Sequence, residues 1–174
     1  AKAKDLGAGE DAVIAEAFLT SGTDKAAALS MLARIHTPAA RSAALLVVTN
    51  QDGPNDSISW FEKAGIALNE LDADGKFFYI INALRVEEWA LAATTARAMS
   101  EHDFQEAPVL LHAVAMAELV QSIPIEFRTA VLGQVPLDAR HFPLSSTESA
   151  LTARRRAGVL LANVSDFAKS MGVV

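Results

Sequence analysis

The chain has 174 residues, no cysteine and a formal net charge of -6, and 51% of its residues are hydrophobic. This length suits a single domain that buries its own core, while the missing cysteine excludes a disulfide scaffold and a cysteine-bearing zinc site. The acidic balance disfavours broad contact with nucleic-acid phosphates, and no apolar stretch approaches the roughly 20 residues of a membrane-spanning helix.

These properties predict a protein without a membrane span and without a nucleic-acid partner, and we expect a cytoplasmic location. The sequence begins at Ala1 without an initiator methionine and without a signal-like apolar region. This start suits either a processed chain or a piece of a longer protein, and we expect the latter, for which flanking domains are possible.

The first part of the chain has the apolar spacing of helices. Val13, Ile14, Ala17 and Phe18 form an apolar stripe that predicts a helix over residues 10–19. A second helix follows Thr23 or Asp24, either of which suits the N-cap position, and ends before Pro38. Pro38 opens a third helix, because its fixed φ suits a first helical turn.

Five further helices are predicted between turn-rich segments. The segment from Asn50 to Asp56 is dense in turn-forming residues, and Pro124 separates the last two helices. Ser100 to Asp103 is interpreted as the close of the sixth helix. In chain order, the apolar spacing places these helices over residues 58–68, 77–84, 89–99, 108–119 and 127–132.

The last part of the chain has a different character. Residues 137–144 follow Pro136 and contain a second proline, Pro143, which predicts an irregular crossing segment. Ser145 and Glu148 have the spacing of a capping box. We therefore expect a longer closing helix over residues 147–170 that caps the helices before it.

Successive helices group into pairs, and the second helix of each pair carries an alanine in a corresponding place. These alanines are separated by 31, 32 and 34 residues, and they are Ala33, Ala64, Ala96 and Ala130. Periods of this length are typical of stacked helical hairpins, in which each unit needs its neighbours to cover its apolar face.

One of these units resembles a tetratricopeptide repeat. Ser57, Phe61 and Ala64 occupy the small, aromatic and alanine places of that family's second helix. The first hairpin matches in part, at Ala26, Ala33 and Pro38. The resemblance implies an all-α fold of stacked antiparallel hairpins, a short α-solenoid, over residues 10–136. We expect one helical domain over residues 1–174, with residues 137–174 as crossing segment and capping helix.

A second, shorter resemblance leads to another function. Trp60-Phe61, followed by Lys76-Phe77 and Leu84, is similar to a stretch of retroelement capsid proteins. Those proteins assemble into shells from small helical domains. A self-assembling, capsid-like helical domain is therefore the alternative to the repeat interpretation.

No segment carries a recognisable catalytic, cofactor or metal motif. Glu70 to Gly75 resembles the opening of an EF-hand loop, but Ile81 stands where that loop needs a bidentate glutamate. The same residues also suit an acidic turn between helices. Nucleophile-elbow, phosphate-loop and dinucleotide-binding patterns are missing. We expect no cofactor, no metal and no enzymatic activity, with an enzyme of dispersed site as a third option.

The repeat interpretation predicts a protein-interaction or scaffolding module that binds a protein or peptide partner. In such solenoids the first helix of each hairpin usually lines the concave face. The polar residues predicted on those helices are therefore the candidates for partner contact. They are Glu16, Arg41, Asn82, His112 and Glu118.

Overall fold

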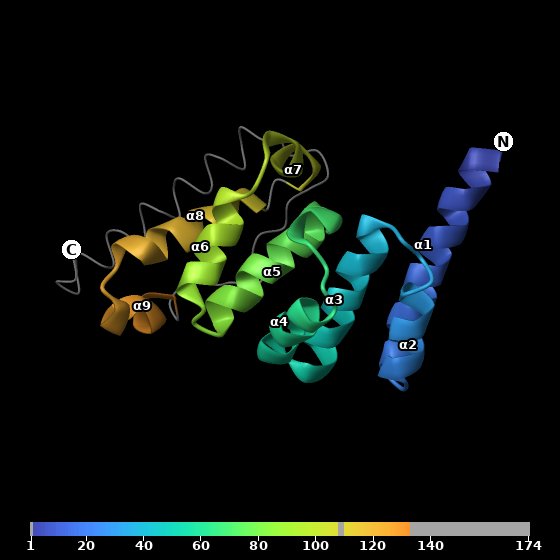
Figure 1. Cartoon of the computed structure of the whole chain (residues 1–174), viewed down its shortest axis with the longest axis horizontal. Coiled ribbons are helices and arrows are strands. Elements are labelled where there is room, and N and C mark those ends of the chain that lie inside the picture. The colour runs from blue at the N-terminus through green and yellow to red at the C-terminus, as the bar shows by residue number, and fades with distance from the viewer. Residues whose placement is uncertain (1, 108–109, 133–174) are drawn as a thin grey trace. The chain divides into compact units, whose positions relative to one another are not determined.

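The computed structural model describes residues 2–107 and 110–132. These residues form α-helices and one short 3-10 helix, with no strand among them, so the all-α prediction is confirmed (Figure 1). The chain divides into two compact units, Ala1–Asn82 and Ala83–Val174, which are described separately. The crossing segment and closing helix predicted over residues 137–170 lie outside the described residues.

The first unit begins with two helical hairpins. Helices α1 (Lys2–Ser21) and α2 (Lys25–Leu32) pack against each other, as do α3 (Pro38–Asp52) and α4 (Pro54–Lys63). Helix α3 also contacts both α1 and α2, so the hairpins lie against one another. A 3-10 turn, η1 (Leu68–Glu70), then leads into α5 (Ala73–Arg85).

Helix boundaries in the first unit follow local capping. Asp24 caps α2 and Thr37 caps α3, each through its side-chain oxygen. The fourth helix ends at Lys63 and not at residue 68 as predicted, because Gly65 adopts a φ of 65°, which stops a helix. Asp72 accepts a hydrogen bond from the Gly75 amide, so α5 begins four residues earlier than the predicted start at residue 77.

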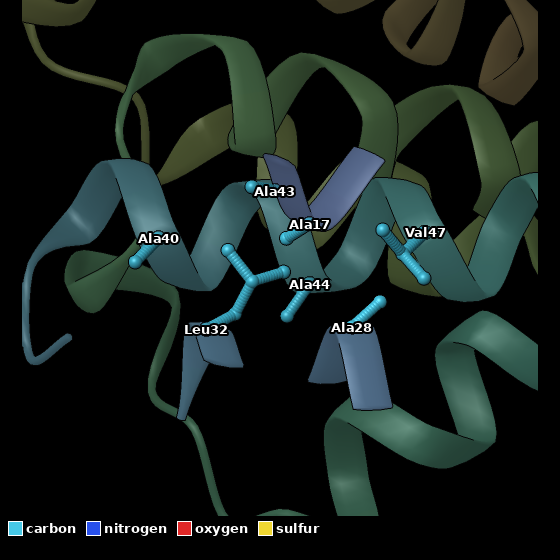
Figure 2. Close-up of a cluster of buried hydrophobic side chains, with 7 residues drawn as sticks. All are labelled: Ala17, Ala28, Leu32, Ala40, Ala43, Ala44 and Val47. Carbon is cyan, nitrogen blue, oxygen red and sulfur yellow. The ribbon is translucent and has the colours of Figure 1, made fainter. Parts of the chain in front are cut away.

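Small side chains bring α1, α2 and α3 close together. Figure 2 shows the core cluster at their junction, in which alanines from three helices surround Leu32 and Val47. Because alanine keeps helix backbones near each other and loses little entropy on burial, an alanine-rich seam suits this tight packing. The cluster consists of Ala17, Ala28, Leu32, Ala40, Ala43, Ala44 and Val47.

The alanine register used to define the repeat does not mark equivalent buried positions. Ala33 and Ala64 are the exposed C-cap residues of α2 and α4, and Ala130 is also exposed. Ala96, in contrast, is buried. The spacing therefore reflects the lengths of the hairpins more than a shared packing position, and the tetratricopeptide resemblance stays a prediction.

Helices α4 and α5 meet through an aromatic pair. The ring centroids of Phe61 and Tyr79 lie 4.6 Å apart, and both side chains are buried. Burial, with a smaller contribution from the negative charge of Glu62, raises the pKa of Tyr79 to about 12.

Tyr79 is the only tyrosine of the chain, so its ionisation can be followed directly by tyrosinate absorbance. We expect the folded protein to titrate near pH 12, against about 10 for the chain in denaturant. Since the folded-state pKa is the higher one, this group's stabilisation is complete below pH 10 and is lost as the pH rises towards 12. A folded-state midpoint near 10 would contradict the burial of this phenol.

The second unit is built on α6 (Trp89–Arg97) and α8 (Leu110–Ser122), which pack together. Helix α7 (Glu101–Glu106) contacts α8, and α9 (Ile125–Leu132) follows it. The side-chain amide of Gln121 donates to the backbone carbonyl of Trp89 over 2.9 Å. Trp89 is buried, so it belongs to the core of this unit.

Two local features of the second unit determine where its helices begin and end. Ser100 and Asp103 were interpreted as a helix end, but they form a reciprocal capping box that starts α7. Glu87 has a φ of 64°, a left-handed backbone conformation that residues other than glycine and asparagine rarely adopt. The Glu88 amide bonds to the Ala83 carbonyl there, so Glu87 occupies the left-handed position of a Schellman-type close of α5.

Candidate functional site

A hollow of about 270 Å³ lies among α1, α3 and the first turn of α5 in the first unit. We call it the acidic hollow. In the part of the chain that the structure describes, its wall combines half-buried apolar side chains with the carboxylates of three aspartates. The lining residues are Asp11, Ile14, Phe18, Ala39, Ser42, Ala43, Leu46, Asp72, Asp74, Gly75 and Phe78.

The floor of the acidic hollow exists because α5 approaches α3 very closely. A Cβ atom built on Gly75 would lie 2.1 Å from the Ser42 Oγ atom, so only glycine fits there without movement. The Ser42 hydroxyl accepts a hydrogen bond from the Asp72 amide over 3.2 Å. The close approach of Gly75 to Ser42 and the hydrogen bond from the Asp72 amide hold the first turn of α5 on the middle of α3.

The apolar part of the wall consists of side chains that are only partly covered. Ile14, Phe18, Leu46 and Phe78 are all half-buried, whereas the neighbouring Phe77 is buried. Phe77 and Phe78 contact each other edge to face, with centroids 5.4 Å apart. One ring thus belongs to the core while the next contributes to the hollow.

A second, larger hollow of about 720 Å³ lies among α2, α3 and α4. Its wall includes Trp60, which is half-buried and packs against the core cluster. Lys25 and Asp52 in this wall form an ion pair of 2.5 Å. Lys63 and Asp56 also line it, so both signs of charge are present. This mixed hollow offers no net preference for a charged ligand.

Three of the five candidate partner-contact residues lie at the surface or close to it, namely Glu16, Arg41 and Glu118. Glu16 on α1 and Glu118 on α8 are exposed. Arg41 on α3 is partly covered and forms an ion pair of 2.7 Å with Glu70, which also accepts a hydrogen bond from the Ala67 amide. Arg41 therefore ties η1 to α3, and none of the three lines the acidic hollow.

Asn82 lies inside the fold, which removes it from the surface that a partner can reach. Its side chain is fully buried, and its amide donates 2.8 Å hydrogen bonds to the hydroxyls of Thr49 and Ser57. Those hydroxyls in turn donate to the Leu45 and Pro54 carbonyls. Asn82 thus joins α3, α4 and α5. His112 lies in α8, but its side chain is outside those that the structure describes.

Sequence reasoning missed the residues that line the acidic hollow. Phe18 is predicted only as part of an apolar helix stripe, and the sequence gives no indication that it shares a surface with Asp11 and Phe78. The detectable signal was the adjacent Phe77-Phe78 pair, since two consecutive helical residues lie about 100° apart and both can be buried only where α5 is covered on two sides. Asp72 and Asp74 belong to the segment that resembled an EF-hand opening.

The segment from Glu70 to Gly75 is an acidic turn that leads into helix α5, as the alternative to the EF-hand interpretation predicted. Asp72 caps α5, and Gly75 lies in the first turn of that helix. Among the described residues, no group of three or more histidine, cysteine, aspartate or glutamate side chains is arranged to hold a metal ion. No helix in the described part of the chain is long and apolar enough to cross a membrane.

Comparison of the chain with models of protein families, with curated proteins and with solved structures finds no significant match.

Proposed function

We propose that the chain is a protein-interaction module that binds a partner segment on the surface formed by α1, α3 and α5. The observation that carries this proposal is the acidic hollow, in which half-buried apolar side chains from these three helices meet. Partly covered apolar side chains that gather from several elements are typical of docking sites.

The size of the hollow favours a partner side chain over a free small molecule. Pockets for drug-sized ligands usually enclose about 300–1,000 Å³, and the acidic hollow has about 270 Å³. That space suits an anchoring side chain from a larger partner, with the rest of the interface formed around it. Anchors in shallow pockets commonly supply most of the binding energy of such interfaces.

The helical arrangement supports the same surface. Helices α1 and α3 are the first members of the two hairpins, and they contact each other. In tetratricopeptide-like solenoids first helices line the binding face, which supports placing the docking surface on α1 and α3. The solenoid arrangement itself is part of this proposal.

The proposal is tested by selecting binders from a displayed library of random peptides on the folded chain. Selected peptides are then measured against Leu46→Ser and Leu29→Ser. Both leucines are half-buried, but Leu46 lines the acidic hollow and Leu29 lines the mixed hollow. We expect Leu46→Ser to weaken binding by about tenfold or more and Leu29→Ser to leave it nearly unchanged.

Thermal unfolding of both variants controls for loss of structure, and Leu46→Met provides a milder change if the serine variant unfolds. Binders that respond to Leu29 and not to Leu46 would move the site to the mixed hollow and overturn the proposal. Failure to enrich any peptide would also count against it. Light scattering of the same samples tests the capsid-like alternative, which requires large closed particles.

A further inference from the structure

We infer that the Asp52–Gly53 dipeptide is a site of spontaneous aspartate isomerisation, and that Lys25 slows this reaction by pairing with the Asp52 carboxylate. The inference goes beyond the proposed function and does not depend on it. Its basis is the joint between α3 and α4, where an exposed aspartate at the end of one helix precedes a glycine. The reaction leaves isoaspartate in the main chain, so it modifies the protein without an enzyme.

The reaction needs only the chain and water. The Gly53 backbone nitrogen attacks the side-chain carboxyl carbon of Asp52, its proton passes to solvent, and one carboxyl oxygen leaves as water. The product is a five-membered succinimide ring. Water then opens the ring at either of its carbonyl carbons. Opening at the side-chain carbon restores aspartate, whereas opening at the backbone carbon leaves the main chain running through the side chain, which is isoaspartate.

The joint requires glycine for a structural reason. Gly53 is the C-cap of α3 and the N-cap of α4, with a φ of 96°. Other residues rarely adopt this conformation, so a side chain there would strain the joint. The same lack of a side chain leaves the Gly53 nitrogen unhindered as a nucleophile. The fold therefore requires, directly after Asp52, the residue that most favours ring closure.

The Asp52–Gly53 bond lies at a helix end, where the backbone opens most readily. The Gly53 amide donates to the Thr49 carbonyl over 3.0 Å at the C-cap of α3. Bonds at helix ends break at a small cost in free energy, and breaking this one frees the nitrogen for attack. Asp52 is exposed and Gly53 is half-buried, so water can reach both the carboxyl group and the ring.

Lys25, the first residue of α2, opposes this opening. Its ammonium group pairs with the Asp52 carboxylate over 2.5 Å. A ring that includes the Asp52 carbonyl carbon and the Gly53 nitrogen cannot form on a helical backbone, so Asp52 must first leave the conformation that it has in α3. That movement takes its carboxylate away from Lys25. The ion pair therefore stabilises the unreactive conformation, by the modest amount typical of a partly exposed pair.

Asp74–Gly75 provides an internal reference, because it is the same dipeptide in a different setting. Gly75 is buried, and its amide donates to the Asp72 carboxylate over 2.8 Å in the first turn of α5. Opening that turn would also separate Gly75 from Ser42, against which it packs closely. We therefore expect isomerisation at Asp74 to be slower than at Asp52 in the folded chain.

Isomerisation changes the lining of the mixed hollow. Isoaspartate adds one carbon atom to the main chain between α3 and α4, and its carboxylate is attached directly to Cα. The pair with Lys25 cannot keep its geometry after both changes. Because Lys25 and Asp52 both line the mixed hollow, ageing of the chain is expected to alter that surface.

The test follows isoaspartate in the folded chain during incubation at neutral pH, below the unfolding transition. Trypsin cleaves after Arg41, Lys63 and Lys76, so the two dipeptides fall in separate peptides. A peptide with isoaspartate keeps its mass and changes its retention time, and the succinimide is lighter by one water. Isoaspartate should form faster at Asp52 than at Asp74. In denaturant the two rates should become similar, because the protection of Asp74 comes from the fold.

Matched variants measure the contribution of Lys25. Lys25→Gln should raise the rate at Asp52 by about twofold to fivefold, the factor expected when an exposed ion pair is lost. Lys25→Arg keeps the charge and should stay close to the parent rate. Arg34→Gln removes one positive charge from an exposed residue just after α2, and it should change the rate by less than about 1.5-fold.

Asp52→Glu is the chemical control, because its longer side chain cannot form the five-membered ring, and circular dichroism checks that each variant is folded. If Asp74 reacts as fast as Asp52 in the folded chain, or if the ratio of the two rates is the same in denaturant, the fold does not select the site and the inference is overturned. An effect of Lys25→Gln no larger than that of Arg34→Gln contradicts the role of the ion pair. A folded chain that forms no isoaspartate at Asp52 overturns the whole inference.

Discussion

Replacing Asn82 with alanine is expected to lower the free energy of unfolding by about 2–3 kcal/mol. The change removes two buried hydrogen bonds of 2.8 Å and leaves the oxygens of Thr49 and Ser57 without their donor. It also opens a small cavity where α3, α4 and α5 meet. Urea denaturation of the variant and the parent chain measures the difference.

Asn50→Ala is the matched control, because Asn50 is an exposed asparagine near the end of α3. Its effect should stay within about 0.5 kcal/mol. Ser57→Ala combined with Asn82→Ala should cost less than the sum of the single changes, since both partners of one bond are then removed. An Asn82→Ala effect no larger than that of Asn50→Ala would show that the buried amide contributes nothing.

The burial of Asn82 also determines how partner binding by the Asn82→Ala variant should be interpreted. Asn82 is a polar residue on a first helix, and the sequence therefore predicts a surface role for it. A loss of binding in Asn82→Ala would come from a smaller folded fraction and not from a lost contact, because the side chain is fully buried. Binding measured well below the unfolding transition should be close to that of the parent chain.

Helices could be predicted from this sequence because their signals are local. The spacing of Val13, Ile14, Ala17 and Phe18 is sufficient for α1, and Pro38 marks the start of α3. The predicted helix boundaries were wrong where two local sequence signals competed. The segment from Ser100 to Asp103 is rich in turn-forming residues, but Ser100 and Asp103 also have the spacing of a capping box. The capping box forms, and it starts helix α7.

The burial of polar residues could not be predicted, because it depends on partners far along the chain. The side-chain nitrogen of Asn82 donates to hydroxyls 33 and 25 residues before it, and nothing in its immediate sequence indicates that they are near. The acidic hollow has the same origin. Asp11, Leu46 and Phe78 come from three helices, and only their packing shows that a carboxylate and two apolar side chains share one surface.

Gly75 provides the sharpest test of that packing. Gly75→Ala should destabilise the parent chain, but it should not destabilise a chain that also carries Ser42→Gly. In the parent chain, Gly75→Ala is expected to lower the free energy of unfolding by about 1–2 kcal/mol. Alanine gains roughly 1 kcal/mol of helix propensity over glycine, but its Cβ would lie 2.1 Å from Ser42 Oγ and 2.7 Å from Ser42 Cβ. Overpacking of this kind typically costs about 1–3 kcal/mol and more at such distances, so the clash outweighs the propensity.

Ser42→Gly removes both of the atoms that Gly75→Ala would meet, and leaves Leu71 Cβ at 3.2 Å as the nearest contact. Ser42→Gly alone should destabilise the chain, because it places glycine inside α3 and deletes the acceptor for the Asp72 amide. In that background Gly75→Ala should become neutral or stabilising by up to about 1 kcal/mol.

Gly9→Ala serves as the control for helix propensity, since Gly9 lies within α1 and a Cβ there would meet nothing within 4 Å. It should stabilise the chain in either background by about 0.5–1 kcal/mol. If Gly75→Ala behaves like Gly9→Ala in the parent chain, α5 does not approach α3 as closely as described. The floor of the acidic hollow would then be missing, and with it the geometric basis for placing an anchor beside Asp74 and Leu46.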